Sequence, residues 1–297
     1  MVAAVILLAG CGGSESATTG GANQAPGAKP GGDKKEGIKP FADVITKEAK
    51  SDSGVFNVYR VKQKWYYEIP AGELGKDFLL ITTQAKVQTG LGYGGDYVNT
   101  QVVRWDRNGE RILLRSLLHN VVAADSLPIH YAVEKASNPP ILAAFDLQAY
   151  NRDSSAFVID VTDFYTSDIT EIGLSRGARE QFKVRRLDGK RSFIDSVTAF
   201  PTNVEVDVTL TYDAGQVPGD NALSTITVTL HHSMVRLPDQ PMQPRLADER
   251  VGYFTTEQTD FGMKSQRAER VSLGIMEISI SMTPSCGLNP SIPFPSR

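Results

Sequence analysis

Alternation of apolar and polar residues is the main structural signal along this chain. The run Asn203–Tyr212 alternates throughout, which predicts a strand with one face toward a core. Residues 224–231 repeat the pattern after a loop at 213–222, so the two runs are expected to pair as a hairpin. The residues expected to face the core are Val204, Val206, Val208 and Leu210.

Further strands are predicted where β-branched and aromatic residues gather between turn residues. An Asn-Gly pair at Asn108 and Gly109 predicts the tightest of the turns. One short helix is expected within Phe41–Lys50, with Asp43 as its N-cap, and one helical turn at Ser175–Phe182. The fold class is therefore mainly β, with meandering antiparallel hairpins. The remaining expected strands are Val55–Val61, Trp65–Ile69, Phe78–Thr83, Val98–Trp105, Arg111–Leu118, 139–150, 156–162 and Ser192–Phe200.

The N-terminus carries a short apolar run that ends in Leu-Ala-Gly-Cys at Cys11. The run is too short to span a bilayer, and it is typical of the hydrophobic part of a signal peptide. The motif resembles the lipobox of bacterial lipoproteins, which implies lipidation of Cys11. A short buried strand is the alternative. Gly12 after the cysteine favours the outer membrane over the inner one, by resemblance to lipoprotein sorting signals.

Composition then divides the chain into segments. Residues 12–37 have no large apolar side chain, so they are expected to form a disordered linker after a signal peptide at 1–11. A small accessory domain is expected at 38–86, a larger β-rich domain at 87–272, and an aberrant or disordered tail at 273–297. The net charge of −3 and the lack of a basic run argue against a nucleic-acid partner.

The segment Thr89–Tyr97 matches G-x-G-x-x-G through three glycines. A dinucleotide fingerprint must open a helix, whose N-terminus receives the pyrophosphate. Here a β-rich run follows instead, so a flexible loop between strands is the better interpretation.

The four histidines do not form a recognisable metal motif. His231 and His232 are adjacent in a predicted strand and should point to opposite faces, so regular geometry cannot bring both to one ion. His119 and His130 flank an apolar segment and remain weak candidates. No His-Glu-x-x-His and no Cys-x-x-Cys occurs in the sequence.

Two other clusters have a structural and a functional interpretation. Asp160, Asp163 and Asp168 lack calcium-loop spacing, so solvated turns explain them better than a cation site. The aromatic cluster Trp65–Tyr67 is a candidate stacking face for a sugar or peptide, although core packing is the commoner use of such residues. The chain shows no catalytic constellation of its own.

Residues 237–254 form a proline-rich strap. Prolines at three-residue spacing hold such a segment extended, so it should lie across a neighbouring surface. Its charged residues are expected to fix its course and its aromatic pair to anchor apolar surface. The residues assigned to this interdomain strap are Pro238, Pro241, Met242, Pro244, Arg245, Asp248, Arg250, Gly252, Tyr253 and Phe254.

With these blocks in view, the chain resembles the N-terminal half of bacterial zinc-dependent metalloprotease lipoproteins, over about residues 38–272. In that family two uncharacterised domains precede a zincin catalytic domain. The most specific block is Met242–Phe254. The other matching blocks are Gly54–Tyr59, Tyr67–Pro70, Asp77–Leu80, Leu187–Asp195, Ala199–Asn203 and His232–Pro238.

The resemblance implies an accessory region of a cell-envelope, lipid-anchored peptidase. Zinc and the peptide substrate would belong to the catalytic domain, whose His-Glu-x-x-His has no counterpart here, so no catalytic or metal-binding residue is carried over. Because charge falls away after Val271, we also hypothesise a frameshift or premature end near Ser272, with a natural tail as the alternative. The competing hypothesis is a non-catalytic lipoprotein that binds peptide or glycan through Trp65–Tyr67 and Thr89–Tyr97. An unrelated enzyme is the least favoured.

Overall fold

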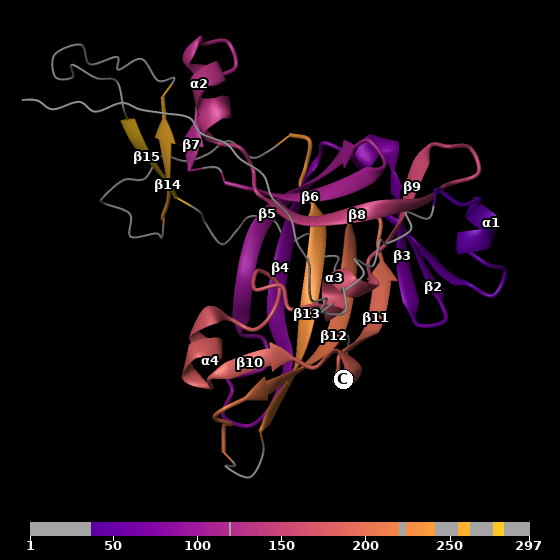
Figure 1. Ribbon diagram of the computed structural model, residues 1–297. Coiled ribbons are helices and arrows are strands. Elements are labelled where there is room, and N and C mark those ends of the chain that lie inside the picture. The colour runs from indigo at the N-terminus through magenta and orange to yellow at the C-terminus, as the bar shows by residue number, and fades with distance from the viewer. Residues whose placement is uncertain (1–36, 119, 220–223, 241–254, 262–275, 282–297) are drawn as a thin grey trace, which may run out of the picture. The chain divides into compact units, whose positions relative to one another are not determined.

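A computed structural model describes residues 37–118, 120–219, 224–240, 255–261 and 276–281, and residues from Gly37 onward group as one unit (Figure 1). The predicted fold class is confirmed, because strands dominate. Within this part of the chain, no helix is long and apolar enough to cross a bilayer. The helices are α1 (Phe41–Val44), α2 (Ile129–Ala136), α3 (Thr162–Thr166) and α4 (Arg176–Gln181), with 3-10 turns η1 (Ala71–Glu73) and η2 (Gly189–Arg191).

The strands form one large antiparallel sheet and one small sheet. The large sheet has the order β1-β2-β3-β9-β8-β6-β5-β4-β13-β12-β10, and β11 also pairs with β12. The strands are β1 (Lys50–Ser53), β2 (Asn57–Val61), β3 (Lys64–Pro70), β4 (Asp77–Val87), β5 (Tyr97–Asn108), β6 (Arg111–Leu117), β7 (Val121–Val122), β8 (Ile141–Tyr150), β9 (Ala156–Asp160), β10 (Val184–Leu187), β11 (Phe193–Ala199), β12 (Asn203–Ala214), β13 (Thr225–Arg236), β14 (Thr255–Asp260) and β15 (Met276–Ser281).

The hairpin predicted from alternation is the β12–β13 pair, whose register runs from Asn203 opposite Val235 to Asp213 opposite Thr225. Its apolar residues are buried as predicted. We call the buried side of this pair the inner face and the opposite side the outer face. The inner face carries Val204, Val206, Val208 and Leu210 with Leu230, His232 and Met234, and the outer face carries Asn203, Glu205, Asp207 and Thr209 with Thr229, His231 and Ser233.

The tight turns occur where the sequence places them. The predicted hairpin between β5 and β6 is confirmed, with Gly109 and Glu110 as its two loop residues and Asn108 as the last residue of β5. Gly109 has a φ of +63°, which glycine adopts without strain.

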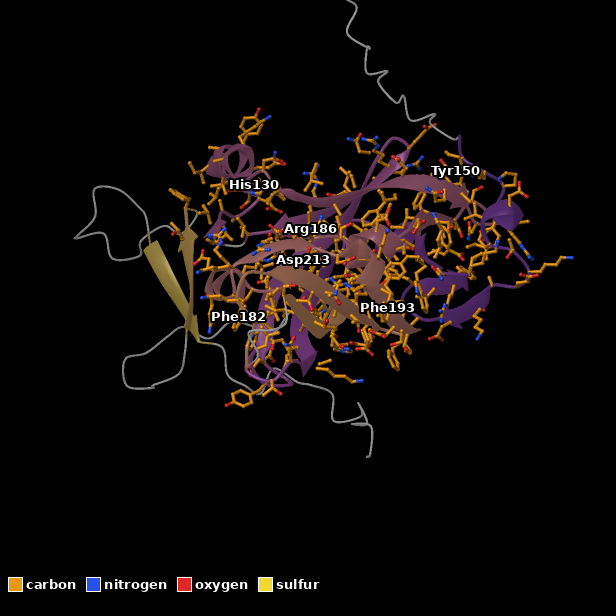
Figure 2. The ribbon with its side chains drawn as sticks, turned by 60° about the horizontal axis from the view of Figure 1, so that its bottom comes forward. His130, Tyr150, Phe182, Arg186, Phe193 and Asp213 are labelled. Carbon is orange, nitrogen blue, oxygen red and sulfur yellow. The ribbon has the colours of Figure 1, made fainter. Side chains whose placement is uncertain are left out.

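At the sheet edge, Arg186 of β10 forms an ion pair of 2.8 Å with Asp213 of β12, and Figure 2 labels both residues. The predicted helical turn near Ser175 is α4, with the Ser175 side chain accepting from the amide of Ala178.

The short helix predicted within Phe41–Lys50 is confirmed, but its predicted N-cap is wrong. Only Phe41–Val44 is helical, Pro40 takes the N-cap position in place of Asp43, and β1 already begins at Lys50. The β1–β2 hairpin then reaches the far end of the sheet. The Val55 amide donates to the Phe200 carbonyl (2.7 Å), and the Ala199 amide donates to Asp52 Oδ2 (2.9 Å). These contacts, together with α3 against β3, β11 and β12, join the two ends of the curved sheet.

Aromatic side chains form a closed circuit of contacts in the core. Each ring lies 4.8–6.4 Å, centroid to centroid, from the next. Such packing adds to the apolar burial that stabilises the sheet. In order around the circuit the rings are Trp105, Phe145, Phe164, Tyr165, Tyr67 and Phe56.

The expected boundary between residues 86 and 87 falls at the end of β4. Strand β4 lies between β13 and β5, and both neighbours come from the second expected domain (Figure 1). Strand β3 likewise pairs with β9. The two segments therefore contribute strands to one continuous sheet.

The small sheet has the order β15-β14-β7, with β14 parallel to β7. Two backbone bonds fix this pairing, from Thr259 N to the Asn120 carbonyl (2.7 Å) and from Phe261 N to the Val122 carbonyl (2.9 Å). Strand β15 falls within the segment expected to be an aberrant tail, and the rest of that segment lies outside the described residues.

Candidate functional site

The outer face of β12 and β13 holds a group of titratable side chains around His231. His231 Nε2 lies 2.8 Å from Glu205 Oε2, and Nδ1 lies 2.7 Å from Asp207 Oδ1. Hydrogen bonding to Glu205 first, and then to Asp207, raises the pKa of His231 to about 9, against the opposing effect of partial burial. The imidazole is therefore a fixed cation near neutral pH.

Neighbouring hydroxyl groups complete this outer-face network. Ser233 Oγ donates to Glu205 Oε1 (2.7 Å), Ser196 Oγ donates to Asp207 Oδ2 (3.0 Å), and Asn203 also donates to Glu205. Because both nitrogens of His231 face carboxylates, neither presents a lone pair to a metal or a substrate proton. The network can tie β11, β12 and β13 together, but it has no free base.

His232 lies on the inner face, so the prediction that the two histidines point apart is confirmed. Its Nδ1 lies 3.0 Å from Thr82 Oγ1, and its ring packs 5.3 Å from that of Tyr165. Burial lowers the pKa of His232 to about 3, aided by the nearby charge of His231. A neutral, enclosed imidazole is a core residue and not an exposed ligand.

The other candidate metal ligands do not converge. Asp160 pairs with Lys64 (2.8 Å) and Asp168 pairs with Arg179, while Asp163 occupies the first turn of α3. His130 lies near the carbonyl of Ala123 (3.1 Å). His119 is outside the described residues. Among the residues that the structure describes, no three His, Cys, Asp or Glu side chains are grouped to hold an ion.

The aromatic cluster Trp65–Tyr67 is not a stacking surface, so that part of the binding hypothesis is wrong. All three side chains are buried. Trp65 and Tyr67 pack into the main core, while Tyr66 packs on the opposite side of β3 against Val44 and Ile45 of the N-terminal segment. Strand β3 is covered on both faces, which explains its unbroken aromatic run.

The glycine loop instead presents the exposed aromatic side chains. It connects β4 to β5, as predicted, and no helix follows it. Gly90, Gly92 and Gly95 have φ angles of +87°, +143° and +94°, respectively, which explains their residue type. Tyr93 and Tyr97 are 80% and 76% exposed. Sequence reasoning selected the loop for its glycines and missed these two tyrosines.

The loop is tied closely to β4. The backbone N–H of Gln84 donates to the backbone carbonyl of Asp96 (2.9 Å), and the backbone N–H of Gly95 donates to the backbone carbonyl of Gln84 (2.7 Å). The backbone N–H of Tyr93 donates to Asp96 Oδ2 (2.8 Å). Leu91, within the loop, is buried in the core. These contacts tie the loop to β4.

The strap is described only at its start. The Leu237 amide donates to the Asp77 carbonyl (2.9 Å), and Arg236 pairs with Asp239 (2.9 Å), so the chain leaves β13 along β4. Of the strap residues, Pro238 is described, and Pro241, Met242, Pro244, Arg245, Asp248, Arg250, Gly252, Tyr253 and Phe254 lie outside the described residues, as does Cys11.

Comparison with known proteins identifies two uncharacterised segments. Residues 38–87 match the Domain of unknown function (DUF5118), and residues 95–273 match the Domain of unknown function (DUF5117). No curated protein and no solved structure matched the chain. Because the DUF5117 match spans more than half of the chain, the chain belongs to the DUF5117 family, and a DUF5118 segment precedes the matched region.

Proposed function

We propose that this chain is the non-catalytic accessory region of a zinc-dependent metalloprotease of the bacterial cell envelope. The observation that carries the proposal is that His231 and His232 both have structural roles. One imidazole is held between two carboxylates, and the other is enclosed in the core. Both residues are used for structure, which fits a region whose family resemblance lies in accessory domains.

In this proposal, the remaining chemistry belongs to a zincin domain. That domain supplies the zinc ligands, the general base and the peptide-binding cleft. The strap 237–254 connects it to the sheet, and a lipid on Cys11 anchors the assembly in the outer membrane. The continuous sheet built from both family segments supports a rigid spacer or positioning role.

Zinc content and hydrolysis of a labelled casein test the proposal. We expect the purified chain, after incubation with zinc and dialysis, to retain well under one zinc per chain and to leave the casein intact. Stoichiometric zinc that is lost in His231→Gln would contradict the structural role of the outer-face network. Reading the coding sequence downstream for a His-Glu-x-x-His motif tests the link to a zincin domain directly.

The second candidate is a binding lipoprotein that acts without a catalytic partner. The exposure of Tyr93 and Tyr97 on a tied loop favours it, because large exposed aromatics are typical of recognition surfaces. The two candidates are compatible, since an accessory region of a protease can also recognise a ligand.

A further inference from the structure

Basic side chains gather on the last strand of the large sheet. Strand β10 pairs with β12 and, among the described strands, has no neighbour on its other side. The turn η2 follows it after one residue. Five of the nine residues at 183–191 are basic and exposed, and their ion-pair partners in the described part of the chain are two carboxylates, which leaves an excess of three positive charges. We call these five residues the β10–η2 basic cluster: Lys183, Arg185, Arg186, Lys190 and Arg191.

A β-bulge brings the two arginines of β10 to the solvent side. Val184 and Arg186 lie opposite consecutive residues of β12, so Arg185 is the additional residue of the bulge. Val184 and Leu187 are half-buried against the core, whereas Arg185 and Arg186 between them are both exposed. Regular alternation would turn one of these two arginines toward the core. The bulge therefore assembles a cluster that is not a continuous basic run in the sequence.

Two arginines of the cluster share one carboxylate. Arg186 Nε lies 2.8 Å from Asp213 Oδ2, and Arg191 Nη2 lies 3.3 Å from Asp213 Oδ1; Figure 2 labels Arg186 and Asp213. Arg191 Nε also lies 2.8 Å from Asp188 Oδ2. These ion pairs place β10 and η2 next to each other on β12. The cluster members that form no ion pair within the described residues are Lys183, Arg185 and Lys190.

An exposed aromatic residue lies on the same side of the sheet. Phe193 of β11 is 52% exposed and lies opposite Thr209 of β12. Thr209 and Asp213 both belong to the outer face of β12, at a spacing of about 13 Å along the strand. The carboxylate of Asp195 also lies here, where it accepts a hydrogen bond from Thr209 Oγ1 (2.7 Å). The outer face thus presents cationic side chains and a large apolar ring close enough for one contact surface.

We propose that the β10–η2 basic cluster and Phe193 dock on the anionic headgroup surface of a membrane. Basic side chains are attracted to anionic headgroups, and an aromatic ring beside them enters the boundary between headgroups and acyl chains. The assignment rests on the proposed cell-envelope location, in which a lipid on Cys11 holds the chain at a membrane. The contact lays β10 against that membrane and gives the accessory region one orientation there.

Protection of a sheet edge does not account for these features. Charged residues and bulges on an edge strand prevent its pairing with another chain. Strand β10 has only four residues, yet the cluster continues into η2 beyond the strand. Edge protection also leaves the exposed ring of Phe193, on a different strand, without a role. A lipid anchor favours a membrane over a nucleic acid as the partner, because it keeps the cluster at a high local concentration of headgroups.

Co-sedimentation with lipid vesicles tests the assignment. The chain is made as Cys11→Ser, so that no lipid of its own contributes. We expect it to bind vesicles of equimolar phosphatidylglycerol and phosphatidylcholine but not vesicles of phosphatidylcholine alone, and to be released at about 0.5 M NaCl. The variant Lys183→Gln/Arg185→Gln/Lys190→Gln should bind at least about tenfold more weakly, since it removes three charges without breaking an ion pair. Phe193→Ala should bind about threefold more weakly.

The matched control removes the same charge elsewhere. Lys47→Gln/Lys62→Gln/Arg152→Gln alters three exposed residues that form no ion pair within the described part of the chain, and it should bind like the parent chain. Thermal melting shows whether each variant is folded. If the cluster variant is not, the salt dependence of the parent chain and the Phe193→Ala variant still test the assignment.

Three outcomes overturn the assignment. They are equal binding to neutral and anionic vesicles or to neither, equal weakening by the two triple variants, and retardation by single-stranded DNA without vesicle binding, which would make the partner a nucleic acid. Vesicle binding does not depend on a zincin domain. The membrane contact can therefore fail while the zinc, casein and coding-sequence results stand, or the reverse.

Discussion

Two adjacent histidines lie on opposite faces of the β12–β13 pair and are held in opposite protonation states. His231 is kept charged by Glu205 and Asp207, whereas His232 is kept neutral by burial beside Thr82 and Tyr165. One step along a strand reverses the side of the sheet and with it the preferred protonation state. The protonation state of a histidine in this sheet therefore depends on the face on which it lies more than on its residue type.

The largest expected effect comes from the hydrophobic core against which the inner face of the β12–β13 pair packs. Phe56→Ala removes a fully buried ring from the aromatic circuit and should lower the free energy of unfolding by about 3–5 kcal/mol. Urea denaturation measures it. Phe193→Ala is the control, because that ring is 52% exposed on β11 and should cost less than about 1 kcal/mol. Equal losses of unfolding free energy in the two variants would mean that Phe56 and Phe193 do not lie in different environments.

Acidification tests His232. Its pKa is lowered in the folded state, so the stability it contributes is complete above pH 6.5 and declines as pH falls toward 3. The loss attributable to this group should reach about 2 kcal/mol between pH 6.5 and 5. His232→Phe should remove that part of the decline, measured by urea titrations at each pH. An unchanged acid slope would show that the imidazole is not buried.

Alkaline conditions test His231, with the opposite sign. Its pKa is raised in the folded state, so its contribution is complete below pH 6.5 and declines as pH rises through about 9. Because the side chain is partly exposed, the expected loss is about 1 kcal/mol or less. His231→Gln should flatten the alkaline part of the stability curve. A slope that persists in this variant would assign the effect to other groups.

The smallest effect is expected at the rim of the outer-face network. Ser196→Ala removes one hydrogen bond to Asp207 and should lower the unfolding free energy by about 0.5 kcal/mol, since Asp207 keeps His231. Thermal melting at pH 7 should show a small decrease in Tm. A loss as large as that of Phe56→Ala would mean that the network, and not the core, holds β11 in place.

Local patterns predicted a good part of this fold. The alternation in Val204–Leu210, the hairpin turn after Asn108 and the opposite directions of His231 and His232 follow from period-two geometry and turn chemistry. Each depends on neighbours in sequence, which a reader of the sequence can see.

Local sequence patterns do not predict which distant segments pair with one another. The contact of the β1–β2 hairpin with Phe200 joins residues far apart in sequence, and the burial of Trp65–Tyr67 depends on β9 and the N-terminal segment covering both faces of β3. The exposure of Tyr93 and Tyr97 likewise follows from how the glycine loop folds back on Gln84. Residue type in these segments can be read from the sequence, but the neighbours that decide burial or exposure come from other parts of the chain.

Direct titration of the two imidazoles by NMR is the most direct test that these histidines serve structure. The signals of the two imidazoles are assigned with the variants His231→Gln and His232→Phe, each of which removes one of them. The structure predicts that His231 is still charged at pH 7 and titrates near pH 9, while His232 stays neutral until about pH 3. Two histidines that both titrate near 6.5 would contradict the account, because they would be solvated side chains free to act as ligands or bases.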